Sequence, residues 1–270
     1  SRRARRHRIG ATVKPYRVVG TIHAGCRLVL TVEHASNAVP LPLVGSAADE
    51  QWLATHWGWD PGAAAVATEL SANLGAVAVL AGFSRLVVDA NRPPDHPDLI
   101  RTAVEGYPLS FNRDLSEAER TRRVNALHVP YHDAIDRHLA EVRAVSERVL
   151  LVSVHSFTPV FDTVSRPMEL GVLFDDHEDL AEQWACALED EGYITARNEP
   201  YSGRVGLIYA AQRHGRNHGI DHLELEMRQD LVDTPAGAHK VAAAIGRALR
   251  KLPHIADEPG DSISYSERIV

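Results

Sequence analysis

Short apolar runs rich in β-branched residues alternate along the chain with longer segments of helical periodicity. Several of the apolar runs are uninterrupted, which is typical of parallel strands buried on both faces of a sheet. Runs of this length bounded by turn residues predict strands. We expect strands at residues 27–32, 76–80, 85–89, 148–154, 170–174 and 223–227.

The segments between these runs carry helix start and stop signals. Asp60 is expected to be the N-cap of a helix whose first position is Pro61, and Gly75 should end that helix. Ser116 and Glu119 have the spacing of a capping box, and Pro130 should kink or divide the helix that follows. Helices are expected at residues 61–75, 116–145, 178–191 and 236–251.

Strands interleaved with helices of this length predict an α/β fold, a three-layer α/β/α sandwich around a mainly parallel sheet. No repeat at solenoid periods interrupts the pattern. The domain organisation we expect is a basic flexible tail, one catalytic α/β/α domain and a second flexible tail, at residues 1–20, 21–253 and 254–270.

Composition adds limits to this picture. A net charge of −7 is unfavourable for a nucleic-acid surface, and the basic start "SRRARRHR" is interpreted as a solvated tail. No stretch approaches the roughly 18 apolar residues of a membrane span. Cys26 and Cys186 lack metal-finger spacing, and with no secretory signal we expect reduced thiols and a cytoplasmic protein.

The candidate chemistry lies where the predicted strands end. In open α/β sheets the ligand site is at the carboxyl ends of the strands. One strand ends at Glu33 and His34, and another ends at His155 and Ser156. Two imidazoles and one carboxylate, with a position left for water, form the ligand set of a catalytic zinc.

The third ligand is open at this stage. Asp60 lies at a predicted helix start in "HWGWDPGA", where an ordinary N-cap is an equal explanation. Glu33 neighbours His34, but adjacent strand residues point to opposite faces, so it could share the metal only if the backbone turned. Asp60 is the carboxylate we favour.

Alternation in "HLELEMRQD" places Glu224, Glu226 and Arg228 on one face of a strand. On an exposed edge strand this would be a solvated charged face. In a central strand near a metal, the acidic residues could instead supply a general base with a raised pKa.

Two loops carry candidate substrate-binding residues. In "SRLVVDANRPP", Arg85 precedes the predicted strand, and Asn91 and Arg92 follow it. A guanidinium there could bind a carboxylate, although surface charge is the simpler explanation. Tyr201 and Arg204 lie in a segment of turn composition that could close over a ligand.

Two histidine pairs have i, i+4 spacing, which can ligate a metal on a helix. They are His128 with His132, and His214 with His218. Neither pair has the glutamate of an HExxH motif, so we do not include them in the ligand set.

Seven motifs occur in an order that resembles the N-formylglutamate amidohydrolase family. They span roughly residues 27–235 and are "VEHASNAVP", "HWGWDPGA", "SRLVVDANRPP", "YHDAID", "SVHSFTP", "NEPYSGRVG" and "LELEMRQD". That family resembles the zinc carboxypeptidases and aspartoacylases in fold. The resemblance implies a mixed, zinc-exopeptidase-like central sheet and one divalent metal, expected to be zinc.

The same resemblance implies roles for single residues. His34 and His155 match metal-binding positions, Glu226 matches the glutamate that acts as base and proton carrier, and Arg92 after Asn91 looks like the pair that holds the substrate carboxylate. Glu226 and Arg92 are thus the expected catalytic residues. The chain departs from the HxxE ligand pair of zinc carboxypeptidases, because Asn37 stands three residues after His34.

The sequence-based hypothesis is a metal-dependent amidohydrolase acting on a small anionic N-acyl amino acid such as N-formylglutamate. His34, Asp60 and His155 would hold the zinc that activates water, Glu226 would move the proton, and Arg85 would assist the oxyanion. The alternatives are a hydrolase of another N-acyl amino acid or small peptide, and a metal-dependent carboxylate-binding protein without catalysis. The oligomeric state is open.

Overall fold

The computed structural model describes residues 9–11 and 13–256 of the chain. The expected tail at 254–270 falls mostly, and the expected tail at 1–20 partly, on residues 1–8, 12 and 257–270, which lie outside the described residues.

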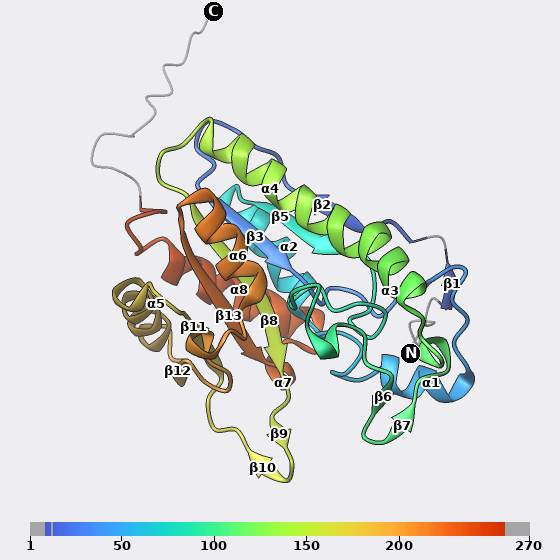
Figure 1. The fold of residues 1–270 in the computed structure, drawn as a ribbon. Helices are drawn as coiled ribbons and strands as arrows, with labels where there is room; N and C mark the ends of the chain where they lie inside the picture. Colours follow the sequence, from blue (N-terminus) through green and yellow to red (C-terminus); the bar gives the residue numbers. More distant parts are fainter. Residues whose placement is uncertain (1–8, 12, 257–270) are drawn as a thin grey trace, which may run out of the picture.

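A mixed seven-stranded sheet forms the centre of the molecule (Figure 1). Four of its six strand pairs are parallel, and the pairs β11 with β13 and β2 with β5 are antiparallel. In spatial order the strands are β12 (Thr195–Arg197), β11 (Leu170–Leu173), β13 (Asp221–Arg228), β8 (Leu150–Phe157), β3 (Leu28–Val32), β5 (Val77–Ala81) and β2 (Tyr16–Val19).

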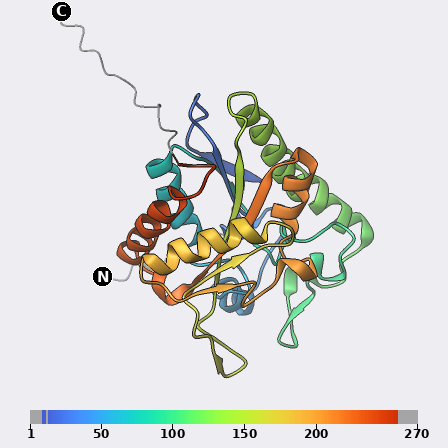
Figure 2. The same cartoon turned by 90° about the vertical axis from the view of Figure 1, so that its left-hand side faces the viewer.

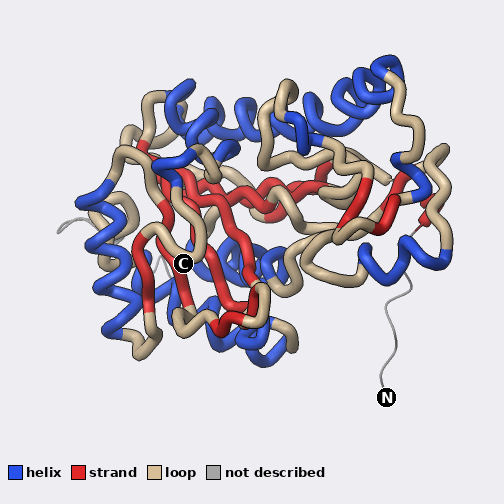
Figure 3. Tube along the Cα trace, turned by 60° about the horizontal axis from the view of Figure 1, so that its bottom comes forward, coloured by secondary structure: helices blue, strands red, loops and turns tan. Residues whose placement is uncertain are grey.

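Helices cover both faces of this sheet, which gives the predicted three layers (Figures 2 and 3). One face is covered by α2 (Ala63–Leu74), α5 (Glu178–Asp190) and α8 (Pro235–Leu249). The other face is covered by α4 (Val129–Arg143) and α6 (Tyr209–His218). The predicted α/β/α sandwich with a mixed, mainly parallel sheet is therefore confirmed.

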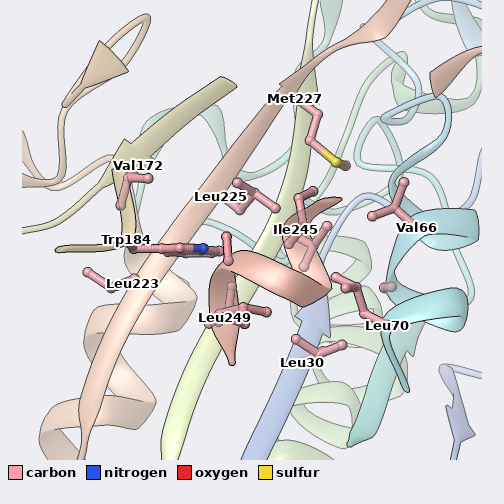
Figure 4. Packing of buried hydrophobic residues seen from close by; sticks show 14 of the residues in the cluster. Leu30, Val66, Leu70, Val172, Trp184, Leu223, Leu225, Met227, Ile245 and Leu249 are labelled. Atoms are coloured by element: carbon pink, nitrogen blue, oxygen red, sulfur yellow. The ribbon is translucent and has the colours of Figure 1, made fainter. Parts of the chain in front are cut away.

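Two apolar clusters hold these layers together. Figure 4 shows Leu225 and Met227 of β13 packing with Ile245 and Leu249 of α8 and with Trp184 of α5. A second cluster lies on the other face, where α4 packs against β3 and β5. All five residues of β3 and of β5 are buried, as uninterrupted apolar runs predict.

The remaining elements are short and lie in the connections. The strand pairs are β1 (Ile9–Ala11) with β4 (Val39–Pro40), β6 (Ala103–Val104) with β7 (Tyr107–Pro108), and β9 (Val160–Phe161) with β10 (Val164–Ser165). The short helices are α1 (Ala47–Leu53), α3 (Glu117–Arg123) and α7 (Gln229–Val232), the 3₁₀ turns η1 (Pro97–Leu99), η2 (Ser110–Asn112) and η4 (Gly203–Val205), and the π-helical turn η3 (Val124–His128).

The strand predicted at residues 85–89 is wrong. Leu86, Val87 and Val88 are buried in the second apolar cluster, yet they lie in an irregular connection. Asp89 ends this connection, where its amide N–H donates to the Leu99 carbonyl over 2.8 Å. A short apolar run predicts burial, and here burial is achieved without a neighbouring strand.

The start of α2 also differs from the prediction. Its N-cap is Gly62 rather than Asp60, and no side chain caps it. Gly75 ends the helix in the left-handed conformation, as predicted. The Asp60 side chain is consequently available for contacts outside the helix.

One further boundary differs from expectation, and the predicted division of the helix near Pro130 is confirmed. Tyr16–Val19 pairs with β5 as an edge strand, so the sheet begins inside the segment 1–20 that we expected to be a tail. The long helix predicted from Ser116 is divided into α3 and α4 by η3, which ends just before Pro130. None of the helices in the described part of the chain is long and apolar enough to cross a membrane.

Candidate metal centre and active-site cavity

A cavity of about 400 Å³ opens at the carboxyl ends of β3 and β8. The side chains of Glu224 and Glu226 on β13 reach it from the centre of the sheet. Residues 85–101 and 201–207 supply further parts of its wall. The cavity therefore lies where an open α/β sheet usually binds its ligand.

His34, Asp60 and His155 meet at the inner end of this cavity. One potential ligand atom from each lies within 4.8 Å of the other two, and all three residues are buried. The Asp60 Oδ2 atom is 3.3 Å from His34 Nδ1 and 2.8 Å from His155 Nδ1. Asp60 reaches this point because its own backbone N–H donates to the His34 carbonyl.

The other nitrogen of each histidine faces a second carboxylate. His34 Nε2 donates to Asp89 Oδ1 over 2.7 Å, and His155 Nε2 donates to Glu33 Oε2 over 2.9 Å. This pattern, in which the far imidazole nitrogen donates to a carboxylate, orients histidine ligands in metal sites. Glu33 therefore lies behind His155, away from the Nδ1 atoms that face Asp60.

These contacts test whether the residues fit a divalent cation. Each imidazole lies between two carboxylates, so the Nδ1 atom that faces Asp60 must carry a proton or face a cation. Five buried carboxyl groups surround the site, and they are Glu33, Asp60, Asp89, Glu224 and Glu226. The guanidinium groups of Arg85 and Arg92 can balance the charge of only two of them. Two imidazole nitrogens and one carboxylate oxygen are a donor set that suits zinc, so the residues fit the expected metal.

The carboxylates closest to the histidines are held in the charged form. Burial acts to raise the pKa of Asp60, but the charge of His34 and the hydrogen bond from His155 lower it. Burial likewise opposes ionisation of Asp89, and the Arg85 and His34 charges bring the pKa of Asp89 well below its ordinary value. Asp60 and Asp89 are thus anionic at neutral pH.

Glu226 and Glu224 behave in the opposite way. Burial raises the pKa of Glu226 well above its ordinary value, and burial raises the pKa of Glu224 to about 7. Glu226 stands beside His155 in the β13–β8 register, and its buried Oε2 atom has no hydrogen-bond partner among the described residues. A central strand next to the histidines, rather than an exposed edge, therefore carries this acidic row.

Arg85 and Arg92 line the cavity beside the histidines. Arg85 Nη2 lies 3.2 Å from Asp89 Oδ2 and its Nη1 lies 3.6 Å from Asp60 Oδ1. Arg92 Nε lies 3.4 Å from Asp89 Oδ2. Asn91 bridges two elements, since its Oδ1 accepts from the Ala210 N–H and its Nδ2 donates to Glu224 Oε2.

Tyr201 and Arg204 separate in the structure. Tyr201 lines the cavity, whereas Arg204 lies outside its lining residues and pairs with Glu178 Oε2 over 2.7 Å. The structure therefore brings Tyr201, but not Arg204, to the cavity. The Arg204 guanidinium instead packs over the Phe174 ring.

Two residues that shape the cavity, Asp89 and Arg166, were not predicted from the sequence. Asp89 holds His34, and its position two residues before Asn91 was the available signal. The Arg166 guanidinium lies over the rings of Phe157, Phe161 and Tyr201, which joins the β9–β10 hairpin to the cavity mouth. No pattern in the sequence pointed to Arg166.

Comparisons with known proteins identify the family to which the sequence is similar. Residues 26–232 match the sequence model of the family described as N-formylglutamate amidohydrolase. The chain is 32% identical over 154 residues to an N-formylglutamate deformylase of Pseudomonas putida, a match that covers 50% of the chain and 57% of that relative. A second N-formylglutamate deformylase, from Pseudomonas aeruginosa, is 38% identical over 98 residues, which cover 33% of the chain and 37% of the relative.

Two solved structures are similar over nearly their full length. The gene product Atu2144 from Agrobacterium tumefaciens has a TM-score of 0.77 and 35% identity, over 87% of this chain and 95% of that one. The N-formylglutamate amidohydrolase from Ralstonia eutropha JMP134 has a TM-score of 0.72 and 21% identity, over 89% and 98% of the two chains. The second similarity demonstrates a shared fold.

Proposed function

The chain belongs to the N-formylglutamate amidohydrolase family, and from this premise we propose that it is a metal-dependent amidohydrolase that converts N-formylglutamate to formate and glutamate. One observation carries the proposal. His34, Asp60 and His155 converge in the same cavity as the unpartnered carboxyl oxygen of Glu226.

His34, Asp60 and His155 would hold the metal, and zinc is the ion we propose for this donor set. When bound, zinc supplies Lewis acidity towards an amide carbonyl and towards water. Glu33 and Asp89 keep the two imidazole rings in orientation through their Nε2 atoms.

Glu226 is the proposed base and proton carrier. Its Oε2 atom accepts a proton from the attacking water and delivers it to the leaving amine nitrogen. The raised pKa of Glu226, caused first by burial, suits a group that must bind a proton and then release it near neutral pH.

Substrate binding is assigned to the cations and rings of the cavity wall. Arg92, with Asn91 beside it, binds a carboxylate of the amino acid. Arg85 lies against Asp60 and is placed to stabilise negative charge that develops on the amide oxygen. Tyr201 covers the bound molecule from the loop at residues 201–207.

A second substrate class is N-acyl amino acids with a larger acyl group. The aromatic side chains of Trp57, Phe157 and Phe161 line the cavity, and a formyl group needs little of that apolar surface. A screen of formyl, acetyl and longer acyl amino acids distinguishes the two classes by their kcat/KM ratios.

The direct test combines elemental analysis with an assay for released formate. We expect about one zinc per chain and formate release from N-formylglutamate that is lost on chelation and restored by zinc. Protein that binds carboxylates but hydrolyses no amide in any metal form would instead be a carboxylate-binding protein, and the proposal would fail.

A further inference from the structure

The two histidine pairs with i, i+4 spacing form one connected network next to the loop that carries Asn91 and Arg92. His132 of α4 and His214 of α6 stack with their ring centroids 5.0 Å apart, and His132 Nδ1 lies 2.8 Å from His214 Nε2. His214 Nδ1 lies 2.7 Å from Asp136 Oδ1, and His218 Nε2 reaches the same oxygen at 3.0 Å. None of these residues lines the catalytic cavity.

The inner end of this network holds the backbone of residues 90–92. His132 Nε2 donates to the Ala90 carbonyl over 3.1 Å, and His128 Nε2 donates to the Arg92 carbonyl over 3.0 Å. His128 and His132 are one helical turn apart, so both rings face the same loop. Both are buried, with 1% and 0% exposure.

Residues 89–92 carry three side chains of the site. Asp89 accepts from His34, Asn91 donates to Glu224, and Arg92 lines the cavity. Asp89 has its own backbone anchor, the hydrogen bond from its N–H to Leu99. Beyond Asp89, the histidine contacts fix the peptide groups before Asn91 and after Arg92, and they therefore govern where Arg92 points.

The hydrogen bonds also define which nitrogens carry hydrogen. A carbonyl can only accept, so His132 Nε2 must carry the hydrogen. Burial lowers the pKa of His132 well below its ordinary value, so the ring is neutral and its Nδ1 accepts from His214 Nε2. Burial acts to raise the pKa of Asp136, but the hydrogen bond from His214 lowers it, so Asp136 is a carboxylate acceptor. His214 Nε2 consequently donates to His132 Nδ1 and locks the tautomer of His132.

We propose that His128 and His132 are positioning residues for substrate binding, which hold the Ala90–Arg92 backbone so that Arg92 presents its guanidinium to the substrate carboxylate. His214 and Asp136 keep His132 in the tautomer that donates to Ala90. The inference rests on the proposed function in one respect, the assignment of Arg92 to the substrate carboxylate.

The experiment compares His132→Leu with His132→Gln in zinc-loaded protein. Leucine fills the space without a donor, whereas glutamine can return an N–H close to the position of Nε2. His239→Gln is the matched control, because His239 of α8 is exposed and contacts Glu69 of α2. Both helices lie on the face of the sheet opposite to α4 and α6. The readouts are kcat and KM for N-formylglutamate, the Kd for L-glutamate by calorimetry, and the zinc content.

We expect His132→Leu to raise KM and the glutamate Kd at least tenfold, with kcat within about threefold of wild type and zinc content unchanged. His132→Gln should recover most of the binding, and His239→Gln should match wild type. A folded His132→Leu protein with wild-type glutamate affinity overturns the inference. Equal loss in the leucine and glutamine variants also overturns it, since that result indicates a purely structural role.

His128→Leu carries the test if His132→Leu does not fold. It removes the hydrogen bond to the Arg92 carbonyl together with the ring contact to His132. An unchanged glutamate Kd in this variant overturns the inference. Failure of the proposed function is a separate result, since wild-type protein would then release no formate although its glutamate affinity can still be measured. Wild-type protein that binds no glutamate overturns the positioning role as well.

Discussion

At the scale of single residues, the site depends on carboxyl groups in contrasting surroundings. Asp60 and Asp89 face cations and histidines that keep them ionised, whereas Glu226 lies in the same buried region with an unpartnered oxygen. Groups whose surroundings push their pKa values apart can take different chemical roles. Holding the histidines and moving a proton are therefore assigned to different carboxylates.

Replacing Glu226 by glutamine tests the proton-carrying role. Glutamine keeps the shape of the side chain but cannot accept a proton at neutral pH, so we expect formate release to fall by at least 10²-fold. Zinc content should stay at the wild-type level, because Glu226 is outside the group formed by His34, Asp60 and His155. Normal turnover in the glutamine variant would remove Glu226 from the mechanism.

Replacing Glu33 by glutamine tests the orientation of His155. The His155 N–H would then donate to a neutral amide oxygen instead of a carboxylate, which weakens the hold on the ring. We expect zinc affinity to fall by about 10-fold, measured by competition with a zinc-binding dye. Glu69→Gln serves as control, because Glu69 is partly exposed and lies on α2 away from the cavity lining. Equal affinities in both variants would contradict the assignment.

At the scale of elements, the start of α2 sets the position of Asp60. The helix begins after Gly62, which has φ +85°, and an added Cβ there would lie 2.4 Å from Val232 Cγ2. Glycine is therefore required both by the left-handed conformation and by the close approach of α7. With Gly62 as the cap, Asp60 can turn towards the histidines.

Replacing Gly62 by alanine should destabilise the protein by about 2–4 kcal/mol, through the left-handed conformation and overpacking. Urea unfolding measures this change. Gly192→Ala is the matched control, since Gly192 has φ +90° but nothing lies within 4 Å of an added Cβ. A loss in the Gly62 variant no larger than in the control would show that Val232 moves aside without cost.

At the scale of the whole molecule, the buried negative charge of the site links stability to metal. A ligand that binds only the folded state stabilises it by about 2.7 kcal/mol at a free concentration 100 times its Kd. We therefore expect zinc to raise the Tm of chelator-treated protein by roughly 5–10 °C. Calorimetric scans measure the shift, and an equal rise in His34→Asn would show that zinc acts at another place.

A buried neutral histidine links stability to pH in the same sense as a paired carboxylate, because both have a lowered pKa in the folded protein and the unfolded chain binds the proton more readily. The unfolded chain binds a proton at His132 below about pH 6.5, while the folded protein resists it because burial lowers the pKa of His132. The free energy of unfolding is therefore unaffected by His132 above pH 6.5. It falls as the pH drops from 6.5 towards the folded-state pKa, with a slope of up to about 1.4 kcal/mol per pH unit. The decrease in unfolding free energy between pH 7 and pH 5.5 should be smaller in His132→Gln than in wild type. Equal decreases in the two proteins would contradict this account.

The sequence alone determined the features that depend on neighbours along the chain. Short apolar runs located β3, β5, β8 and β11, and an alternating pattern located β13. Local caps located the end of α2 at Gly75 and the start of α3 after Ser116. Strand ends also indicated His34 and His155, because parallel strands present their carboxyl ends at one rim of a sheet.

Only the tertiary structure decided the arrangement around those histidines. Asp60 is separated from His34 by 26 positions and Glu33 from His155 by 122, so no local pattern could place one carboxylate between the rings and the other behind them. The run at 85–89 shows the same limit, since its burial was predictable but its backbone pairing was not. Periodicity reports which side chains leave water, whereas their partners depend on contacts that form only when distant segments pack together.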